Sequence, residues 1–182
     1  MNLSIVNIGN PVLRKKTSKV APKLRKSRPF LRFVQDMVST MRHAQGVGLA
    51  ANQVQAGLRV MVLECRKNRR YPKAASFPLQ SYINPKIVQY SKRKQKGWEG
   101  CLSIPGFRGV VPRAYSVTFT ATTLQGKSVR KTVSGFEARV VQHEVDHLNG
   151  FFYVDRMEGL RTWTHLEEFN RRHQVKIRDR RG

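Results

Sequence analysis

The chain has 182 residues, of which 35 are lysine or arginine and 11 are aspartate or glutamate, so its formal net charge is +24. A hydrophobic content of 40% with 9% aromatic residues argues against wholesale disorder, and the length favours a single domain. No apolar run reaches the roughly 18–20 residues of a membrane-spanning helix, and the N-terminus lacks the apolar stretch of a signal peptide. Charge alone favours a nucleic-acid-binding protein.

The first part of the chain predicts an arm and then a helix. Residues 1–26 are expected to form an extended, basic arm that Pro11 and Pro22 interrupt. Ser27 can cap the N-terminus of the helix that follows, and Gly46 is placed to end it. The apolar residues of this helix recur at helical spacing: Phe30, Phe33, Val34, Met37, Val38 and Met41.

The middle of the chain predicts strands separated by basic loops. Alternating residues on both sides of a tight turn at 124–127 indicate a β-hairpin. Basic loops are expected over 67–78 and 91–97. Strands are predicted over 59–65, over 82–90 with a break at Pro85, and over 115–122 and 128–133.

The last part of the chain predicts two helices. The first runs from about Gly135 to Asn149 and stops at Gly150. The second is amphipathic and runs from about Gly159 to Arg172, before a polar tail. Strands followed by helices predict an α+β fold of one domain, with mainly antiparallel sheets.

The sharpest local pattern is the run HEVDH at 143–147, inside a predicted helix. Histidines at positions i and i+4 lie on one helix face, so both imidazoles can bind one ion. The alternative is a polar helix face that contains these residues by chance. The apolar neighbours indicate instead a largely buried helix, in which two histidines and two carboxylates without a ligand would be costly: Phe136, Val140, Val141 and Leu148.

Two histidines leave a catalytic metal site incomplete, because such sites usually have three protein ligands and one open position. A downstream glutamate is one option, although the glutamates available lie on or near a helix of solvent-facing type: Glu158, Glu167 and Glu168. The spacing of a third, metzincin-type histidine is occupied by Phe and Tyr. The other option is Cys101 between two glycines, since a thiolate with two imidazoles suits Zn²⁺ or Fe²⁺. Cys65, in an apolar strand, fits an inert core cysteine, and two cysteines in all indicate a reducing compartment.

Three stretches occur in order along the chain: GVGLAANQ at 46–53, EGCLS at 99–103 and QHEVDH at 142–147. Together they resemble the three signature motifs of the peptide deformylases. The likeness runs from NPVLRK at 10–15 to about Tyr153 and includes VPR at 111–113. It implies a catalytic domain, expected over 1–172, that is built around the buried helix with HExxH and ends in a C-terminal helix. The polar and basic residues that follow predict a separate tail over 173–182.

The resemblance also implies roles for individual residues. Glu144 would be the general base that takes a proton from the attacking water, and then the acid that protonates the departing amine. The Gln53 side chain and the backbone N–H of Leu102 would donate to the oxyanion. One divalent ion, expected to be Fe²⁺ with Zn²⁺, Ni²⁺ or Co²⁺ as substitutes, would be held by three ligands: Cys101, His143 and His147.

The substrate chain is expected to lie extended along the first motif, where Gly48 and Gly100 permit close approach of its backbone. Arg139 is expected to point outward or to pair with an acid, and Asp146 to have a structural role with Arg113 as one partner. An apolar pocket for the methionine side chain is implied, with His143 at its floor and three lining residues: Val47, Phe136 and Val140.

The resemblance implies a hydrolase that removes the formyl group from the N-terminal formyl-methionine of nascent polypeptides and releases formate. A zinc endopeptidase is the alternative enzyme, although it leaves the cysteine motif unexplained. The alternative from another class is an RNA- or ribosome-binding protein with a structural metal. The basic surface, with six cations between Arg171 and Arg181, predicts contact with ribosomal RNA. No membrane contact is expected, because no apolar run is long enough to span a bilayer. The expected compartment is a bacterial-type cytoplasm in preference to an organelle.

Overall fold

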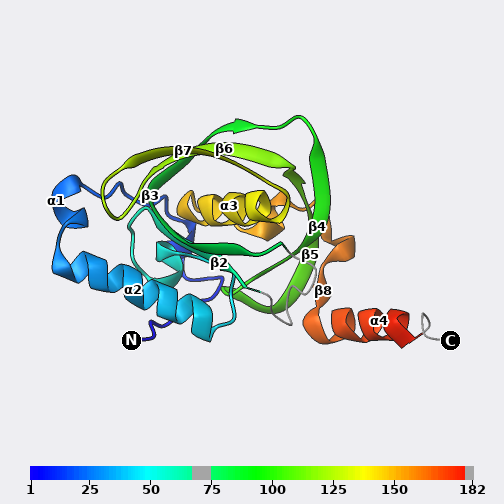
Figure 1. Ribbon diagram of the computed structural model, residues 1–182. Helices are drawn as coiled ribbons and strands as arrows, with labels where there is room; N and C mark the ends of the chain where they lie inside the picture. The colour runs from blue at the N-terminus through cyan, green and yellow to red at the C-terminus, as the bar shows by residue number, and fades with distance from the viewer. Residues whose placement is uncertain (67–74, 179–182) are drawn as a thin grey trace.

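One buried helix, α3 (Gly135–Leu148), lies between antiparallel strands, as the computed structural model in Figure 1 shows. The structure describes residues 1–66 and 75–178, with side chains as far as Arg172. The larger sheet has the order β1-β2-β3-β6-β7 and the smaller one the order β4-β5-β8. The strands of the larger sheet are Gly48–Ala50, Val60–Cys65, Phe77–Tyr90, Ser116–Thr122 and Ser128–Ser134. Those of the smaller sheet are Lys94–Cys101, Ile104–Ala114 and Thr164–His165.

Strand β2 is apolar from Val60 to Leu63 because helices cover both of its faces. Val60 and Val62 belong to the apolar cluster of helix α2 (Arg28–His43), whereas Met61 and Leu63 belong to the cluster of α3. Alternate side chains of a strand point to opposite faces, so α2 and α3 lie on opposite sides of the sheet (Figure 1). Two-sided burial explains an apolar run without alternation.

The predicted helix after the arm is confirmed as α2, but it ends earlier than expected. Ser27 Oγ accepts a hydrogen bond from the Phe30 N–H at 3.3 Å, which is the predicted cap. The helix stops at His43, and Gln45 takes the left-handed conformation at φ 53°. Gln45, and not Gly46, is the left-handed residue, but the Gly46 N–H donates to the Met41 carbonyl oxygen at 2.9 Å and so caps the last turn of the helix. A Cβ atom there would lie 2.9 Å from Leu102 Cδ1, so Gly46 makes room for that side chain.

Other expectations for the first half need correction. The arm contains short helical turns, η1 (Pro11–Arg14) and α1 (Pro22–Arg25), and is not extended throughout. Strand β3 passes through Pro85 without a break, because a register shift between Ile83 and Lys86 takes up the proline. The loop predicted over 67–78 lies outside the described residues at 67–74, and its last two residues begin β3.

The second predicted loop, 91–97, is wrong from Lys94 onward, where β4 begins, and β5 was not predicted. Strand β4 is at the edge of its sheet, so its lysines face solvent while its backbone pairs with β5. Charged side chains are common on edge strands because they discourage pairing with a second molecule. The basic composition of residues 94–97 therefore led to the prediction of a loop where the structure has a strand. The hairpin of β6 and β7 is confirmed.

The C-terminal region differs from its prediction in its bounds. The residues after Gly159 form a turn, η4 (Leu160–Thr162), and strand β8 before helix α4 (Leu166–Arg178) begins. The helix continues beyond Arg172 into the predicted tail, and residues 179–182 lie outside the described part. Trp163 stacks on Phe107 of β5, with ring centroids 4.4 Å apart, and attaches this region to the smaller sheet. None of the helices in the described residues is long and apolar enough to cross a membrane.

Candidate active site

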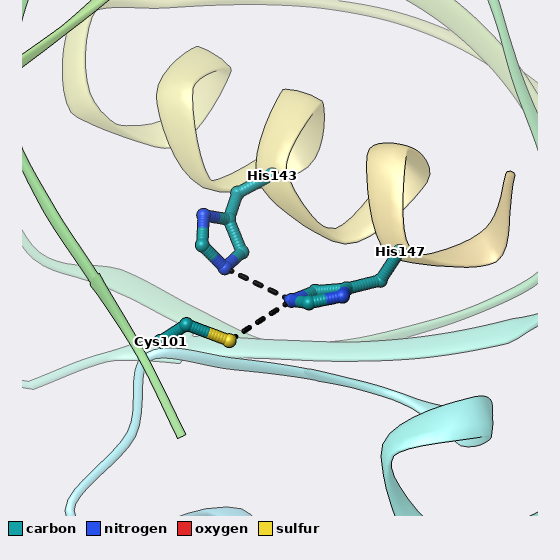
Figure 2. A group of neighbouring side chains, drawn as sticks. All are labelled: Cys101, His143 and His147. Atoms are coloured by element: carbon teal, nitrogen blue, oxygen red, sulfur yellow. Dashed lines mark hydrogen bonds between the residues drawn. The ribbon is translucent and has the colours of Figure 1, made fainter. Parts of the chain in front are cut away.

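Two histidines of α3 and one cysteine of β4 converge on one point (Figure 2). His143 and His147 are one helical turn apart, and their Nε2 atoms lie 3.2 Å from each other. Cys101 Sγ lies 3.1 Å from His147 Nε2, and the three ligand atoms are all within 4.8 Å of one another. A thiolate and two imidazoles at this spacing fit a tetrahedral ion with bonds of about 2.0–2.3 Å.

The short connection between β4 and β5 positions the cysteine. Cys101 is the last residue of β4 and pairs with Ile104 across a turn made by Leu102 and Ser103. The Ser103 N–H points at Cys101 Sγ at 3.3 Å, and Gln53 Nε2 lies 3.6 Å from the same sulfur. These two donors hydrogen-bond the sulfur and fix its position beside the two histidines.

Gln53 lies in the turn η2 (Ala51–Val54), and the oxygen atom of its side-chain amide fixes its orientation. Its Oε1 accepts a hydrogen bond from the Ala50 N–H at 2.9 Å, so its Nε2 faces Cys101 and also donates to Ser103 Oγ at 3.1 Å. The neighbouring Asn52 is fully buried and donates from Nδ2 to the His147 carbonyl oxygen at 2.6 Å. Through these hydrogen bonds the first motif contacts both segments that carry metal ligands, the end of β4 and helix α3.

Glu99 is a site residue to which the sequence analysis gave no role. Its carboxylate is 5% exposed and accepts a hydrogen bond from His143 Nδ1 at 2.9 Å, which directs Nε2 of that ring toward Cys101 and His147. Burial acts to raise the pKa of Glu99, but Arg113 and His143 hold it well below its ordinary range. The only signal in the sequence was an acid two residues before the cysteine, inside the second motif.

Two buried arginines, Arg113 and Arg139, hold the carboxylate of Glu99. Arg113 donates to both carboxylate oxygens of Glu99 at 2.9 and 3.0 Å, and also contacts Asp146, which confirms the expected pair. Arg139 donates to Glu99 Oε1 at 2.7 Å and to the Val111 carbonyl oxygen at 2.9 Å. Arg139 therefore pairs with an acid and does not point outward. Two guanidinium groups neutralise one buried carboxylate, and strands β4 and β5 are tied to α3.

Glu144 faces Gly48 of strand β1. A Cβ atom at Gly48 would lie 2.4 Å from Glu144 Oε1, so only glycine leaves room for this carboxylate. Glu144 is 4% exposed, and its Oε2 has no hydrogen-bond partner among the described residues. Burial raises the pKa of Glu144 to about 7. Burial likewise lowers the pKa of His147, which favours the neutral ring that binds a metal.

A single cleft is lined by all but one of the residues predicted for the site. His147 is the exception and is fully buried. Arg139 is part of the lining although it was expected elsewhere. Cys65 lies apart from it, buried in β2, and burial raises the pKa of its thiol. The predicted residues in the lining are Val47, Gly48, Gln53, Gly100, Cys101, Leu102, Phe136, Val140, His143 and Glu144.

A family model described as polypeptide deformylase matches residues 2–163. The chain belongs to this deformylase family. Peptide deformylase 1 of Bordetella pertussis is 41% identical over 165 residues, which cover 90% of this chain and 92% of that protein. Peptide deformylase 2 of a Nostoc strain is 40% identical over 157 residues, or 86% and 87% of the two chains. A solved class I type b deformylase from Acinetobacter baumannii, with Met-Ala-Ser bound, aligns with a TM-score of 0.84 at 39% identity, covering 86% of this chain and 99% of that one.

Membership of the deformylase family establishes the reaction class. The protein is a metal-dependent hydrolase that removes formyl groups from nascent polypeptides. The endopeptidase alternative and the alternative of an RNA-binding protein with a structural metal are not supported. The predicted α+β fold with antiparallel sheets is confirmed by the same structures. The deformylase family uses one metal ion, in agreement with the three converging ligands.

Proposed function

We propose that Cys101, His143 and His147 hold one Fe²⁺ ion and that the residues around them deformylate peptides that begin with formyl-methionine. The observation that carries this proposal is the convergence of one sulfur and two imidazole nitrogens beside a buried carboxylate. When bound there, a divalent ion would polarise the formyl carbonyl and make a water molecule more acidic. Zn²⁺, Ni²⁺ or Co²⁺ also suit these ligands.

Air inactivation distinguishes iron from its substitutes. A ferrous centre with a thiolate ligand is open to oxidation, so protein prepared without oxygen should lose activity on exposure to air. The metal content and the rate of formate release are measured on the same sample, before and after exposure. Activity that survives long exposure, with zinc or nickel in the metal analysis, would contradict the assignment of iron.

The substrate backbone lies, in this proposal, along β1. This strand is at the end of the larger sheet, so its outer edge is open to a further strand. Gly48 and Gly100 line the cleft and let the two backbones approach closely. The Met-Ala-Ser peptide in the Acinetobacter deformylase supports a methionine at the first position. Its side chain would occupy the apolar part of the cleft, formed by Val47, Phe136 and Val140.

Glu144 moves the protons of the reaction. Its carboxylate accepts a proton from the water that attacks the formyl carbon, and then delivers it to the amine that leaves. A pKa of about 7 suits both roles, because the group is then neither a very weak base nor a very weak acid near neutral pH. Two donors stabilise the negative oxygen of the tetrahedral intermediate: the amide Nε2 of Gln53 and the backbone N–H of Leu102.

The test is Glu144→Gln, with Glu137→Gln as the matched control. Both glutamates lie on α3, but Glu137 binds Lys131 at 2.8 Å and does not line the cleft. Loss of a general acid–base should lower kcat by about 10²–10⁴-fold in the first variant, with metal content unchanged. The control should retain its rate of formate release from a formyl-Met peptide. Full activity of Glu144→Gln would refute the assigned role.

The compartment and the ribosome contact are proposals of their own. The relatives are bacterial proteins, which supports a bacterial cytoplasm. The net charge of +24 favours binding to RNA near the point where nascent chains emerge. We assign residues 1–172 to the catalytic domain and 173–182 to a ribosome-binding tail. Deletion of 173–182 should weaken co-sedimentation with ribosomes and leave turnover unchanged; an unchanged, salt-insensitive association would count against it.

A further inference from the structure

A second hollow, which we call the basic cavity, lies between the segment before α1, strands β3 and β6, and the end of α3. It shares no lining residue with the active-site cleft. Its described lining contains four cations and no carboxylate. The residues that matter here are Lys16, Lys19, Arg59, Lys86 and Tyr90, with Asn149 beside them.

Arg59 is the unusual member of the basic cavity, because it is 8% exposed and forms no ion pair with a described residue. Its Nε donates to the Pro85 carbonyl oxygen at 2.9 Å, and its Nη1 donates to Asn149 Oδ1 at 2.9 Å and to the Leu148 carbonyl oxygen at 3.2 Å. Nη2 has no hydrogen-bond partner in the described part of the chain. Neutral oxygens orient the guanidinium group but leave its charge uncompensated.

A buried charge without a counter-charge is costly, and the pKa of Arg59 reflects this cost. Burial lowers the pKa of Arg59, whereas Arg113, which has carboxylate partners, has a raised pKa. A bound anion would supply the missing counter-charge. The planar fork of a guanidinium group matches the oxygens of a phosphate particularly well.

The surroundings of Arg59 favour a ligand with more than one charge. Lys16, Lys19 and Lys86 are exposed around the basic cavity, so their side chains can turn toward a ligand. Tyr90 is 59% exposed, which leaves a ring face for a nucleobase. A smaller hollow adjoins the cavity through shared residues, Asn84 and Thr120, and adds Arg130. The cations therefore lie along an extended stretch of the surface and are not confined to one point.

We propose that the basic cavity binds a phosphate group, that of a nucleotide or of a single-stranded RNA, on the guanidinium group of Arg59. The lysines around it add charge, and Tyr90 adds a surface for stacking. The site is independent of deformylation, because none of its residues lines the cleft.

The test uses the holoenzyme and two probes, a fluorescein-labelled ten-nucleotide oligouridylate and unlabelled uridine monophosphate. The double variant Lys16→Ala/Lys86→Ala should bind the oligonucleotide at least tenfold more weakly by fluorescence anisotropy. Its plot of log affinity against log salt should become shallower by about 1.4, since each contact with a single strand contributes about 0.7. The matched control is Lys92→Ala/Lys127→Ala, two exposed lysines outside the cavity, and should bind within twofold of the unchanged protein.

Competition by uridine monophosphate assigns the cavity to single nucleotides, whereas cavity-dependent binding of the oligonucleotide alone assigns it to an RNA strand. Equal losses in the two double variants, or no binding of either probe, would overturn the proposal.

Arg59→Lys tests the guanidinium group itself, since it keeps the charge and removes the fork. It should weaken binding several-fold while formate release stays unchanged. Unaltered binding by a variant with an unaltered melting temperature would overturn the role of Arg59. The lysine variants keep the cavity testable if Arg59→Lys does not fold.

Discussion

Gly48→Ala tests whether the shape of β1 positions the carboxylate of Glu144. The added Cβ would lie 2.4 Å from Glu144 Oε1, whereas ordinary contacts begin at 3.4 Å. The carboxylate must therefore move by about 1 Å, and a displacement of that size can cost about 10²-fold in rate. We expect kcat for formate release to fall by about that factor, equivalent to about 2.7 kcal/mol.

The design must separate displacement of Glu144 from interference with the substrate, because Gly48 also faces the proposed path of the peptide. The matched control is Gly57→Ala, whose Cβ would meet nothing within 4 Å. A double-mutant cycle with Glu144→Gln makes the distinction: if Gly48→Ala acts through Glu144, it should add little to the loss in that background. Metal content should stay constant.

Two results would refute this reasoning. The first is a Gly48→Ala variant with the activity of the Gly57→Ala control. The second is full additivity of Gly48→Ala and Glu144→Gln, with the loss confined to KM, which would mean that the methyl group obstructs the peptide and leaves the carboxylate in place.

Three further predictions concern neighbouring parts of the structure. Glu99→Gln leaves Arg139 buried without a carboxylate and leaves Arg113 with Asp146 alone, so we expect a loss of about 3–5 kcal/mol in urea unfolding and metal binding weaker by about 10–100-fold in chelator competition. Unchanged metal affinity would contradict its role in orienting His143. Leu102→Ala should lower kcat less than tenfold, because the proposed donor is the backbone N–H; a loss above a hundredfold would contradict that. Glu64 is bonded to Arg42 and Arg66, which hold its pKa below the ordinary 4.5, so its pairs stabilise the fold above that pH and cease to do so as the pH falls through the lowered pKa. Glu64→Gln should therefore cost about 1 kcal/mol at pH 7 and progressively less toward pH 3, and a cost independent of pH would contradict the assignment.

Local patterns in the sequence determined the elements that depend on neighbours along the chain. The spacing of His143 and His147 places both rings on one helix face wherever that helix lies. Alternation predicted the hairpin of β6 and β7, and Ser27 marked the start of α2. Composition gave a wrong prediction for β4, which was expected to be a loop because of its lysines. Those lysines face solvent, while the main chain of β4 pairs with β5.

Tertiary structure alone decided which distant residues support the site. Glu99 is 44 positions from His143 and 40 from Arg139, so no local pattern could pair them. The need for glycine at position 48 appears only when Glu144 packs against it. The net charge of +24 favoured a nucleic-acid partner but did not show which part of the surface would bind it. The fold brings lysines of the arm and of β3 around the buried guanidinium group of Arg59. Burial of that group without a carboxylate partner among the described residues depends on tertiary packing, which the sequence does not show.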